Sequence, residues 1–441
     1  EPKDNKDKEF IIPLLVFLAN EYHFIIVDLS FQMGEAVFKT LIQSDYIHII
    51  TDCSNSHIEL ASRLIGELNK SIQNVNDKIK VIINEARPDE ALTDKQRKAI
   101  LKHNIYATLP EIKSLDENRE YLEDKPIVIK EPTSDYSRVI RRISRDLGNV
   151  LVGLALGSGA ALGLAQIGII KVIEKEGIPI DCVVGSSIGS LIGAFWASGK
   201  SAFEIKQITL SFKNRLATLK LMDPAVPRSG LINGDEVVSF LKTHLGNKTF
   251  CDVRFPFKVV ASDIYNREIV VLDNGSLVDA VRISVSIPGI FVPVRQNNSV
   301  LIDGGILDPI PVDALIKMGI RRIIAVDTLP SPEDIQRTNA HQEELAKKLK
   351  EKRSFLKRIK YYFKSTAKRL ITPNIFDIIV NSIQAMEYSL GQSYLQQADV
   401  VLKPRLIDIN WYELFHADKL INLGEEEAIK KLPQIKKLIS E

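Results

Sequence analysis

Cysteine is scarce in this sequence of 441 residues, which holds only Cys53, Cys182 and Cys251. Three widely spaced cysteines argue against a disulfide framework and indicate a reducing compartment. None of them stands at a metal-ligand spacing from any of the seven histidines, so we predict no metal site. The formal net charge of +2 gives no indication of a nucleic-acid partner, and we expect none.

Charge is missing from two stretches, residues 147–170 and 182–199, which are long enough to be considered as membrane spans. The first is rich in glycine and divides into a strand, a glycine turn and a helix. The second contains a serine motif described below. We therefore interpret both as buried core. The Lys and Asp residues that precede Phe10 do not have the pattern of a signal peptide, and we expect a cytoplasmic protein.

A P-loop is also missing, because G-x-x-x-x-G-K-[ST] occurs nowhere in the chain. The N-terminal third nevertheless alternates between helical and strand-like patterns. Helices are expected at 11–20, 36–43, 56–69 and 94–103, and strands at 24–28, 47–50 and 80–83. This alternation predicts an α/β domain with a parallel sheet over residues 1–133.

The order of these elements resembles the later half of the MinD/ParA-type P-loop ATPases. The resemblance implies a Walker B aspartate at Asp28 and an adenine-contacting asparagine at Asn84. Without a P-loop nothing holds a triphosphate, so ATP and Mg²⁺ are implied only if an upstream segment is missing from this chain. The alternative is a degenerate ATPase half that serves as a docking platform, with homo-oligomer formation through this domain. Both explanations stay open.

The junction between the two halves of the chain is rich in loop-forming residues over 126–137. The pattern from Tyr136 to Leu147 then predicts a basic amphipathic helix. We interpret residues 134–147 as a connecting helix with a solvated face, in preference to a phospholipid-binding element. Residues 148–441 form the second predicted domain.

A G-x-S-x-G pentapeptide dominates the second domain. It joins the apolar run that ends at Val184 to a helix-like segment, and it consists of Gly185, Ser187, Gly189 and the residues between them. Strand, sharp turn and helix are the context in which this motif presents a nucleophilic serine. The two glycines let neighbouring backbone pass close to Ser187, and a helix N-terminus favours developing negative charge.

A glycine-rich turn lies upstream, between an expected strand at 149–156 and an expected helix at 164–176. A dinucleotide-binding G-x-G-x-x-G is the alternative interpretation, but Leu162 stands at the position of the third glycine. An oxyanion loop fits better, because acyl transfer needs donors aimed at a tetrahedral oxygen. The predicted donors are the backbone amides of Gly157, Ser158, Gly159 and Ala160.

A D-G-G sequence, Asp303, Gly304 and Gly305, follows a strand-like run further along the chain. An aspartate in such a position is by itself a common turn former. Its place after a glycine-rich loop and a serine elbow favours a catalytic function instead.

These three motifs, in this order, resemble those of the patatin-like phospholipases, especially the branch that includes neuropathy target esterase and its bacterial relatives. Further similar runs are Gly163 to Gly168, Gly177 to Asp181 and Arg282 to Phe291. The resemblance covers residues 150–330, with a weaker similarity in the C-terminal part. It implies a three-layer α/β/α hydrolase domain.

The resemblance also implies a catalytic dyad that hydrolyses acyl esters of phospholipids or lysophospholipids. Ser187 would form the acyl-enzyme, and Asp303 would accept its proton and then activate water. No cofactor is implied. A Ser-Asp-His triad with His416 is the rival arrangement, although no spacing supports it.

The glycine-rich loop departs from the family's G-G-x-[RK]-G pattern at two positions. Leu162 occupies the place of the cation, and Ala160 stands where a third glycine is common. Alanine keeps its backbone amide, whereas loss of the cation removes a source of oxyanion or phosphate recognition. A silent regulatory protein and an acyltransferase that uses the same serine are therefore the alternatives to a hydrolase.

Residues 331–372 have a different composition, with many Lys and Arg residues interleaved with apolar and aromatic ones between His341 and Leu370. This pattern predicts a basic helical segment that contacts the inner face of a membrane peripherally through residues 341–370. A solvated helix or a charged insertion is the alternative. Beyond it, a last strand is expected at 398–404 and a terminal helix from Gly424 onward.

Overall fold

The computed structural model describes residues 6–30, 33–85, 94–112, 125–210, 230–296, 298–351, 375–407 and 409–440. The chain folds into two compact units, Glu1–Ile143 and Ser144–Glu441. The boundary between them falls inside the helix that we interpreted as a linker. In the described ranges, no helix is both long and apolar enough to cross a membrane.

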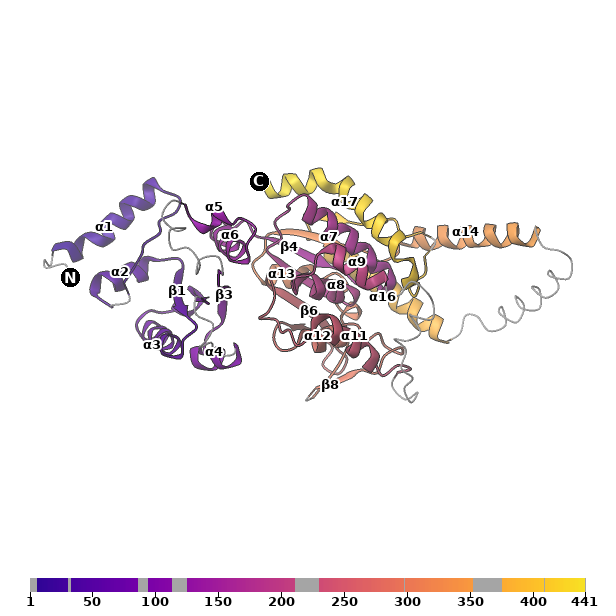
Figure 1. Ribbon diagram of the computed structural model, residues 1–441, viewed down its shortest axis with the longest axis horizontal. Coiled ribbons are helices and arrows are strands. Elements are labelled where there is room, and N and C mark those ends of the chain that lie inside the picture. Colours follow the sequence, from indigo (N-terminus) through magenta and orange to yellow (C-terminus); the bar gives the residue numbers. More distant parts are fainter. Residues whose placement is uncertain are drawn as a thin grey trace. The chain divides into compact units, whose positions relative to one another are not determined.

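Unit 1 is built around a three-stranded parallel sheet in the order β1-β2-β3 (Figure 1). The strands are β1 (Ile47–Asp52), β2 (Ile79–Asn84) and β3 (Ile105–Leu109). The helices beside them are α2 (Glu35–Gln43), α3 (Asn55–Ser71) and α4 (Asp94–Leu101), with a 3-10 turn at Val75–Asp77. The apolar face of α3, which includes Ile58 and Ile65, packs on Val81 and Ile83 of β2. The alternation predicted over 47–103 is thus confirmed, and β3 extends it.

The strand predicted at 24–28 is wrong. After α1 (Lys6–Glu21), residues 22–30 have no regular secondary structure, and Phe24 and Ile26 are 65% and 88% exposed. An apolar run forms a buried strand only where a sheet edge pairs with it and helices cover it. In the described sheet no strand pairs with residues 24–28, and all five of these residues are exposed.

The predicted nucleotide-site residues are not brought to one edge of a sheet. Asp28 is exposed in the irregular segment, whereas Asn84 ends β2 beside Asp52 of β1. No strand of the described chain carries Asp28 to the carboxyl edge where Asn84 lies. The interpretation of Asp28 as the end of a Walker B strand is therefore wrong.

Helices α5 (Ile127–Lys130) and α6 (Asp135–Leu147) follow. Up to Ile143, α6 is part of the core of unit 1, because Ile143 packs with Ile82, Ala107 and Leu109. Basic side chains of α6 bind protein groups. Arg142 donates to the carbonyl of Tyr106 at 3.2 Å, and Arg145 pairs with Asp181 at 3.0 Å. These contacts are those of a packed connecting helix.

Unit 2 contains an eight-stranded mixed sheet. Strands β11, β10, β4, β5 and β6 are parallel neighbours, while β9 runs antiparallel to β6 and to β8. Strand β7 runs antiparallel along β6. The strands are β4 (Val152–Leu156), β5 (Cys182–Ser186), β6 (Phe257–Asp263), β7 (Glu268–Leu272), β8 (Val294–Gln296), β9 (Ser299–Asp303), β10 (Arg322–Val326) and β11 (Val400–Leu402).

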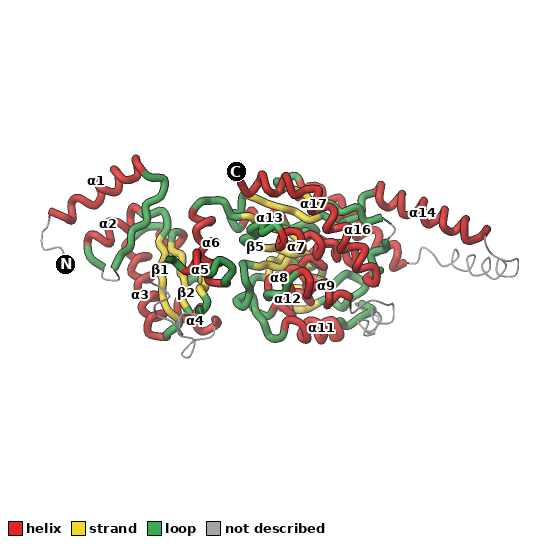
Figure 2. The backbone as a smooth tube through the Cα atoms, turned by 45° about the horizontal axis from the view of Figure 1, so that its top comes forward, coloured by secondary structure: helices red, strands yellow, loops and turns green. Residues whose placement is uncertain are grey.

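Helices cover both faces of this sheet (Figure 2). Along β4, Leu154 and Leu156 pack with one helical layer and Ala155 with the other. The first layer contains α7 (Ala165–Lys175), α8 (Ile188–Ala197), α9 (Ala202–Leu210), α11 (Asp235–Leu245), α12 (Leu277–Ser284) and α17 (Ala417–Ser440). The second contains α13 (Val312–Lys317) and α16 (Ile375–Leu395). The predicted three-layer α/β/α architecture is confirmed.

The C-terminal part returns to the core of unit 2. Helix α17 packs so closely along α7 that a Cβ at Gly424 would meet the carbonyl oxygen of Ala165. Short 3-10 turns occur at Ala160–Leu164, Gly304–Ile306 and Leu414–His416. The predicted basic segment begins as helix α14 (Pro332–Glu351), whereas residues 352–374 lie outside the described residues.

Candidate active site

Ser187 occupies a sharp turn between β5 and α8. Its φ and ψ of 53° and −124° lie in a region that a non-glycine residue adopts only under strain. Both motif glycines are needed for close packing. A Cβ at Gly185 would meet the backbone of Gly189, and a Cβ at Gly189 would meet the carbonyl oxygen of Leu156. The sequence thus forms the elbow because small residues flank the strained serine.

Strand register brings Asp303 to this elbow. β7 pairs with β6 from Val259 to Asp263, so β5 and β9 share the opposite edge of β6. Ser186, the last residue of β5, is paired with Val260, and Asp303, the last residue of β9, is paired with Ala261. The carboxyl ends of two oppositely directed strands therefore meet, and the residues there are the serine and the aspartate.

The two side chains are joined directly. Oγ of Ser187 donates a hydrogen bond of 2.6 Å to Oδ2 of Asp303, and the amide of Gly305 donates one of 2.8 Å to Oδ1. Ser187 is 5% exposed and Asp303 is 1% exposed. Burial raises the pKa of Asp303 to about 7, although the hydrogen bonds from Ser187 and Gly305 act in the opposite direction. The carboxyl therefore titrates close to neutral pH.

The run Arg282 to Phe291 positions both members of this pair. Oγ of Ser284 accepts a hydrogen bond of 2.9 Å from the amide of Ser187, and the carbonyl of Ser286 accepts one of 3.0 Å from the amide of Asp303. The guanidinium of Arg282 donates to Oγ of Ser286 at 2.5 Å. The sequence singled out this run only as a family resemblance and did not indicate its function.

The four predicted oxyanion donors divide into two pairs. The amides of Gly157 and Ser158 donate to the carbonyls of Val326 and Pro309, at 3.2 and 2.7 Å. Within the described chain, the amides of Gly159 and Ala160 have no hydrogen-bond acceptor. Of the four predicted oxyanion donors, the amides of Gly159 and Ala160 are therefore the two that are free to bind an oxyanion. Ala160 has a φ of 49°, where glycine would be less strained, which explains the glycine common in the family at this position.

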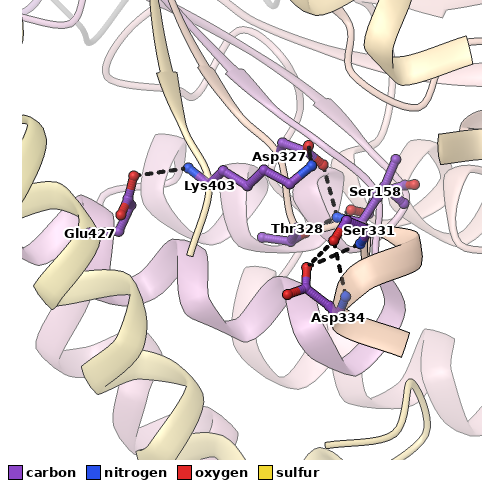
Figure 3. Close-up of polar contacts among 8 residues, drawn as sticks. Ser158, Asp327, Thr328, Ser331, Asp334, Lys403 and Glu427 are labelled. Atoms are coloured by element: carbon purple, nitrogen blue, oxygen red, sulfur yellow. Dashed lines mark hydrogen bonds and ion pairs between the residues drawn. The ribbon is translucent and has the colours of Figure 1, made fainter. Parts of the chain in front are cut away.

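Residues that follow β10 hold this loop in place through a hydrogen bond to Ser158 (Figure 3). Oγ1 of Thr328 donates a hydrogen bond of 2.7 Å to the carbonyl of Ser158. The preceding residue, Asp327, is fully buried and pairs with Lys403 at 2.7 Å, while its other oxygen accepts a bond of 2.9 Å from the amide of Leu329. An ion pair between the ends of β10 and β11, in which Asp327 is buried and Lys403 is half-buried, thus fixes the residue next to the one that holds Ser158.

Leu162, which stands at the position of the family's cation, lies in the core. It is 2% exposed and belongs to the apolar cluster that includes Leu164 and Ile188. Gln166 supports the loop from α7, since its Nε2 donates a hydrogen bond of 2.7 Å to the carbonyl of Gly157. Position 162 therefore stabilises the loop by packing rather than by charge.

A third buried carboxyl lies beside the site and was not predicted. Glu387 of α16 is 8% exposed, and its Oε2 accepts a hydrogen bond of 3.3 Å from Oγ of Ser158. A Cβ at Gly305 would meet its Oε1. One signal was available in the sequence, because Glu387 stands two helical turns from both Val380 and Tyr394, on an otherwise apolar stripe.

The histidine of the rival triad does not join the pair. The ring of His416 packs on Phe415 at a centroid distance of 4.7 Å. In the part of the chain that the structure describes, no histidine is hydrogen-bonded to Asp303. Nor is any group of three His, Cys, Asp or Glu side chains among these residues placed to hold a metal ion.

A strained serine at the end of a central parallel strand, hydrogen-bonded to a buried aspartate and followed by a helix, is the nucleophile elbow of an α/β hydrolase-type site. Comparison with known proteins makes the assignment specific, because residues 154–316 match the family model for patatin-like phospholipases. The chain thus contains a patatin-like phospholipase domain, as its motifs predicted.

Relatives of this domain come from animals, fungi and bacteria. The chain is 33% identical over 219 residues to neuropathy target esterase sws of Drosophila melanogaster, covering 48% of this chain and 15% of that protein. It is 31% identical to lysophospholipase NTE1 of Candida albicans, covering 44% and 15%. It is 33% identical to an uncharacterised NTE family protein of Mycobacterium tuberculosis, covering 40% and 48%. The chain therefore spans less than half the length of these relatives.

Proposed function

We propose that the protein is a serine esterase that hydrolyses acyl esters of phospholipids or lysophospholipids through an acyl-enzyme. The observation that carries this proposal is the 2.6 Å hydrogen bond between the Ser187 hydroxyl and the buried Asp303 carboxylate. The patatin-like family of the domain and its relatives named as an esterase and a lysophospholipase support the choice of substrate.

In the acylation step, Asp303 accepts the hydroxyl proton of Ser187 as Oγ attacks the ester carbonyl carbon. The carbonyl oxygen becomes an oxyanion, and the free amides of Gly159 and Ala160 stabilise it. The tetrahedral intermediate collapses when the C–O bond to the alcohol breaks. The leaving alkoxide takes the proton from Asp303, and the acyl group stays on Ser187.

In the deacylation step, a water molecule attacks the acyl carbon while Asp303 accepts one of its protons. The same two amides stabilise the second oxyanion. The ester bond to Ser187 then breaks, Oγ recovers the proton from Asp303, and the free fatty acid leaves. Because one carboxylate carries the proton in both steps, the cycle needs neither a histidine nor a metal cofactor.

The substrate also suggests where the protein acts. Phospholipids are presented at membrane surfaces, and the sequence between 341 and 370 combines basic with aromatic residues. The proposal therefore includes peripheral contact with the inner face of a membrane through this segment. Binding of the full chain to vesicles that contain anionic lipid, weakened by salt, is the expected behaviour.

Labelling with a fluorophosphonate, which reacts covalently with activated serines, tests the proposed function. We expect the wild-type chain to be labelled on Ser187 and to release fatty acid from a lysophospholipid, and S187A to do neither. S389A is the matched control, because Ser389 is an exposed serine of α16 whose hydroxyl bonds its own helix. H416A should keep activity within several-fold of the wild type, whereas a loss as complete as that of S187A would contradict the dyad.

Two other outcomes would replace the proposal. A folded wild-type chain that is not labelled would indicate a silent regulatory protein. Formation of a new ester in the presence of a glycerol-type acceptor, in place of fatty acid, would indicate an acyltransferase.

A further inference from the structure

Two residues of α16 beyond Glu387, Gly391 and Tyr394, hold this helix against the active site. At Gly391, one turn beyond Glu387, a Cβ would lie 3.2 Å from side-chain atoms of Ile310 and Leu329. At Tyr394, two turns beyond it, the hydroxyl donates a hydrogen bond of 3.1 Å to the carbonyl of Leu307. Since Leu307 and Ile310 follow the D-G-G turn directly, α16 is fastened to the segment that carries Asp303.

These contacts place the carboxyl of Glu387 between two functional loops. Its Oε2 accepts the hydrogen bond of 3.3 Å from Oγ of Ser158, next to the free amide of Gly159. Its Oε1 lies against Gly305, whose own amide binds Asp303. A side chain at position 305 would occupy the place of the carboxyl, so the second glycine of D-G-G makes room for Glu387.

We propose that Glu387 is a positioning residue of the site, which holds the oxyanion loop against the D-G-G turn as a neutral acid and inactivates the site when it ionises. This inference rests on the proposed hydrolytic function. Ionising Glu387 beside the Asp303 carboxylate is unfavourable, because two neighbouring negative charges in a buried site repel each other. This repulsion is the physical reason why Glu387 stays neutral while the site is active.

The electrostatic environment agrees with this assignment. Burial, and then the charge of Asp303, raises the pKa of Glu387 to about 8. The elements packed against α16 carry Asp303, Asp308, Asp313 and Lys317, and the neighbouring strand ends carry the ion pair of Asp327 with Lys403. Among these charges, that of Asp303 is the one that acts on Glu387.

The consequence is a window of activity. Between about pH 7 and pH 8, at least half of the Asp303 carboxyl is ionised and accepts a proton, while at least half of Glu387 is still neutral. At higher pH, Glu387 carries a negative charge. Its carboxyl is hydrogen-bonded to Ser158, the residue before Gly159, whose amide is a proposed donor to the oxyanion. The developing negative charge is then opposed, and turnover falls.

The test is the pH dependence of kcat/KM for the full chain between pH 6 and pH 10, with a soluble short-chain ester as the probe. Each variant is compared with its own maximum. We expect the wild type to lose at least tenfold between its maximum and pH 9.5. We expect E387Q, which keeps the shape of the side chain and a partner for Ser158, to lose less than threefold over that interval.

Two further variants complete the experiment. E387M removes the charge without an amide, so it should abolish the alkaline decline too, and it is decisive if E387Q does not fold. S389A, on the exposed face of the same helix, should keep the wild-type profile. An alkaline decline that is unchanged in the folded E387Q or E387M would overturn this inference alone. A wild-type chain without esterase activity at any pH would instead overturn the proposed function.

Discussion

The backbone amide of Ser187 donates a 2.9 Å hydrogen bond to the side chain of Ser284, whose hydroxyl donates in turn to the carbonyl of Val260 at 2.7 Å. This pair of bonds links the elbow to the central strand β6. It also satisfies a buried amide at the residue whose φ is 53°. Helix α12 ends at Ser284, so the end of this helix determines how the nucleophile is held.

Replacing Ser284 should therefore weaken both the fold and the reaction. In S284A the amide of Ser187 loses its acceptor in a buried position, which should lower the free energy of unfolding by about 1–3 kcal/mol. A relaxed elbow should also lower kcat about tenfold or more, because small displacements of a nucleophile are costly. Denaturant unfolding and ester hydrolysis measure the two effects. S276A removes the N-cap of the same helix, where Oγ accepts from Asp279, and should destabilise the protein without lowering kcat. Equal kcat values for the two variants would contradict this assignment.

Asp303 should give the reaction an acidic limit. Its pKa is raised to about 7 by burial, and only the ionised carboxylate accepts a proton from Ser187. We expect kcat/KM to rise about tenfold per pH unit below pH 6 and to reach its maximum between about pH 7 and pH 8, before the alkaline decline assigned to Glu387. D303N should lose about 10²–10⁴-fold at every pH, since an amide is no base. A decline of activity toward low pH with a midpoint near pH 4 would show that the carboxylate is not desolvated in solution.

Asp308 should make unit 2 less stable as the pH rises. It is 1% exposed, its Oδ1 has no partner among the described residues, and burial followed by the charge of Asp313 raises its pKa to about 7. A raised pKa means that the folded state binds the proton more tightly than the unfolded state does. The stabilisation is complete below the ordinary aspartate pKa of 3.8 and is lost as the pH rises through about 7.

D308N removes this ionisation at nearly constant shape. Between pH 6 and pH 8 the wild type should lose about 1 kcal/mol more stability than D308N does, as measured by denaturant unfolding at the two pH values. D313N is the comparison variant, because it removes the charge that helps to raise the pKa of Asp308 but keeps the Asp308 carboxyl, so its loss of stability should fall between those of the wild type and D308N. Parallel curves for the wild type and D308N would contradict the assignment.

Much of the site could be predicted from local sequence, and the reasons are physical. Gly185 is required by a backbone contact with Gly189, only four residues away, and Gly189 by a contact with the backbone of the neighbouring strand β4, so the elbow is visible as a short motif with two glycines. The pairing of Ser187 with Asp303 was implied by the family resemblance, but its cause is strand register across β6, which no local pattern contains. Three further side chains reach the site from elements that are distant in sequence, namely Ser284, Thr328 and Glu387. For this reason no function could be assigned to them from the sequence alone.

The N-terminal unit shows the opposite case. Phe24 to Val27 has the composition of a buried parallel strand, yet these residues are exposed and irregular. An apolar composition indicates that a segment can be buried, but a strand forms only where it also pairs with the edge of a sheet. The alternation around β1 and β2 was predicted correctly because each strand there is followed by a helix with an apolar face that covers it.

Gly159 provides the most direct test of the oxyanion loop. Its φ is 148°, and a Cβ there would lie 2.5 Å from Oγ1 of Thr328 and 2.8 Å from the Thr328 carbonyl oxygen. G159A must therefore move the loop away from β10, and its two free amides move with it. We expect kcat to fall about 10²–10³-fold, the loss typical of one oxyanion donor.

G177A is the matched control, since Gly177 has a φ of 63° but a Cβ there would have nothing within 4 Å. G177A should cost about 1 kcal/mol of stability and leave kcat near the wild-type value. If G159A and G177A turned over substrate equally well, the amides of Gly159 and Ala160 would not be the oxyanion donors.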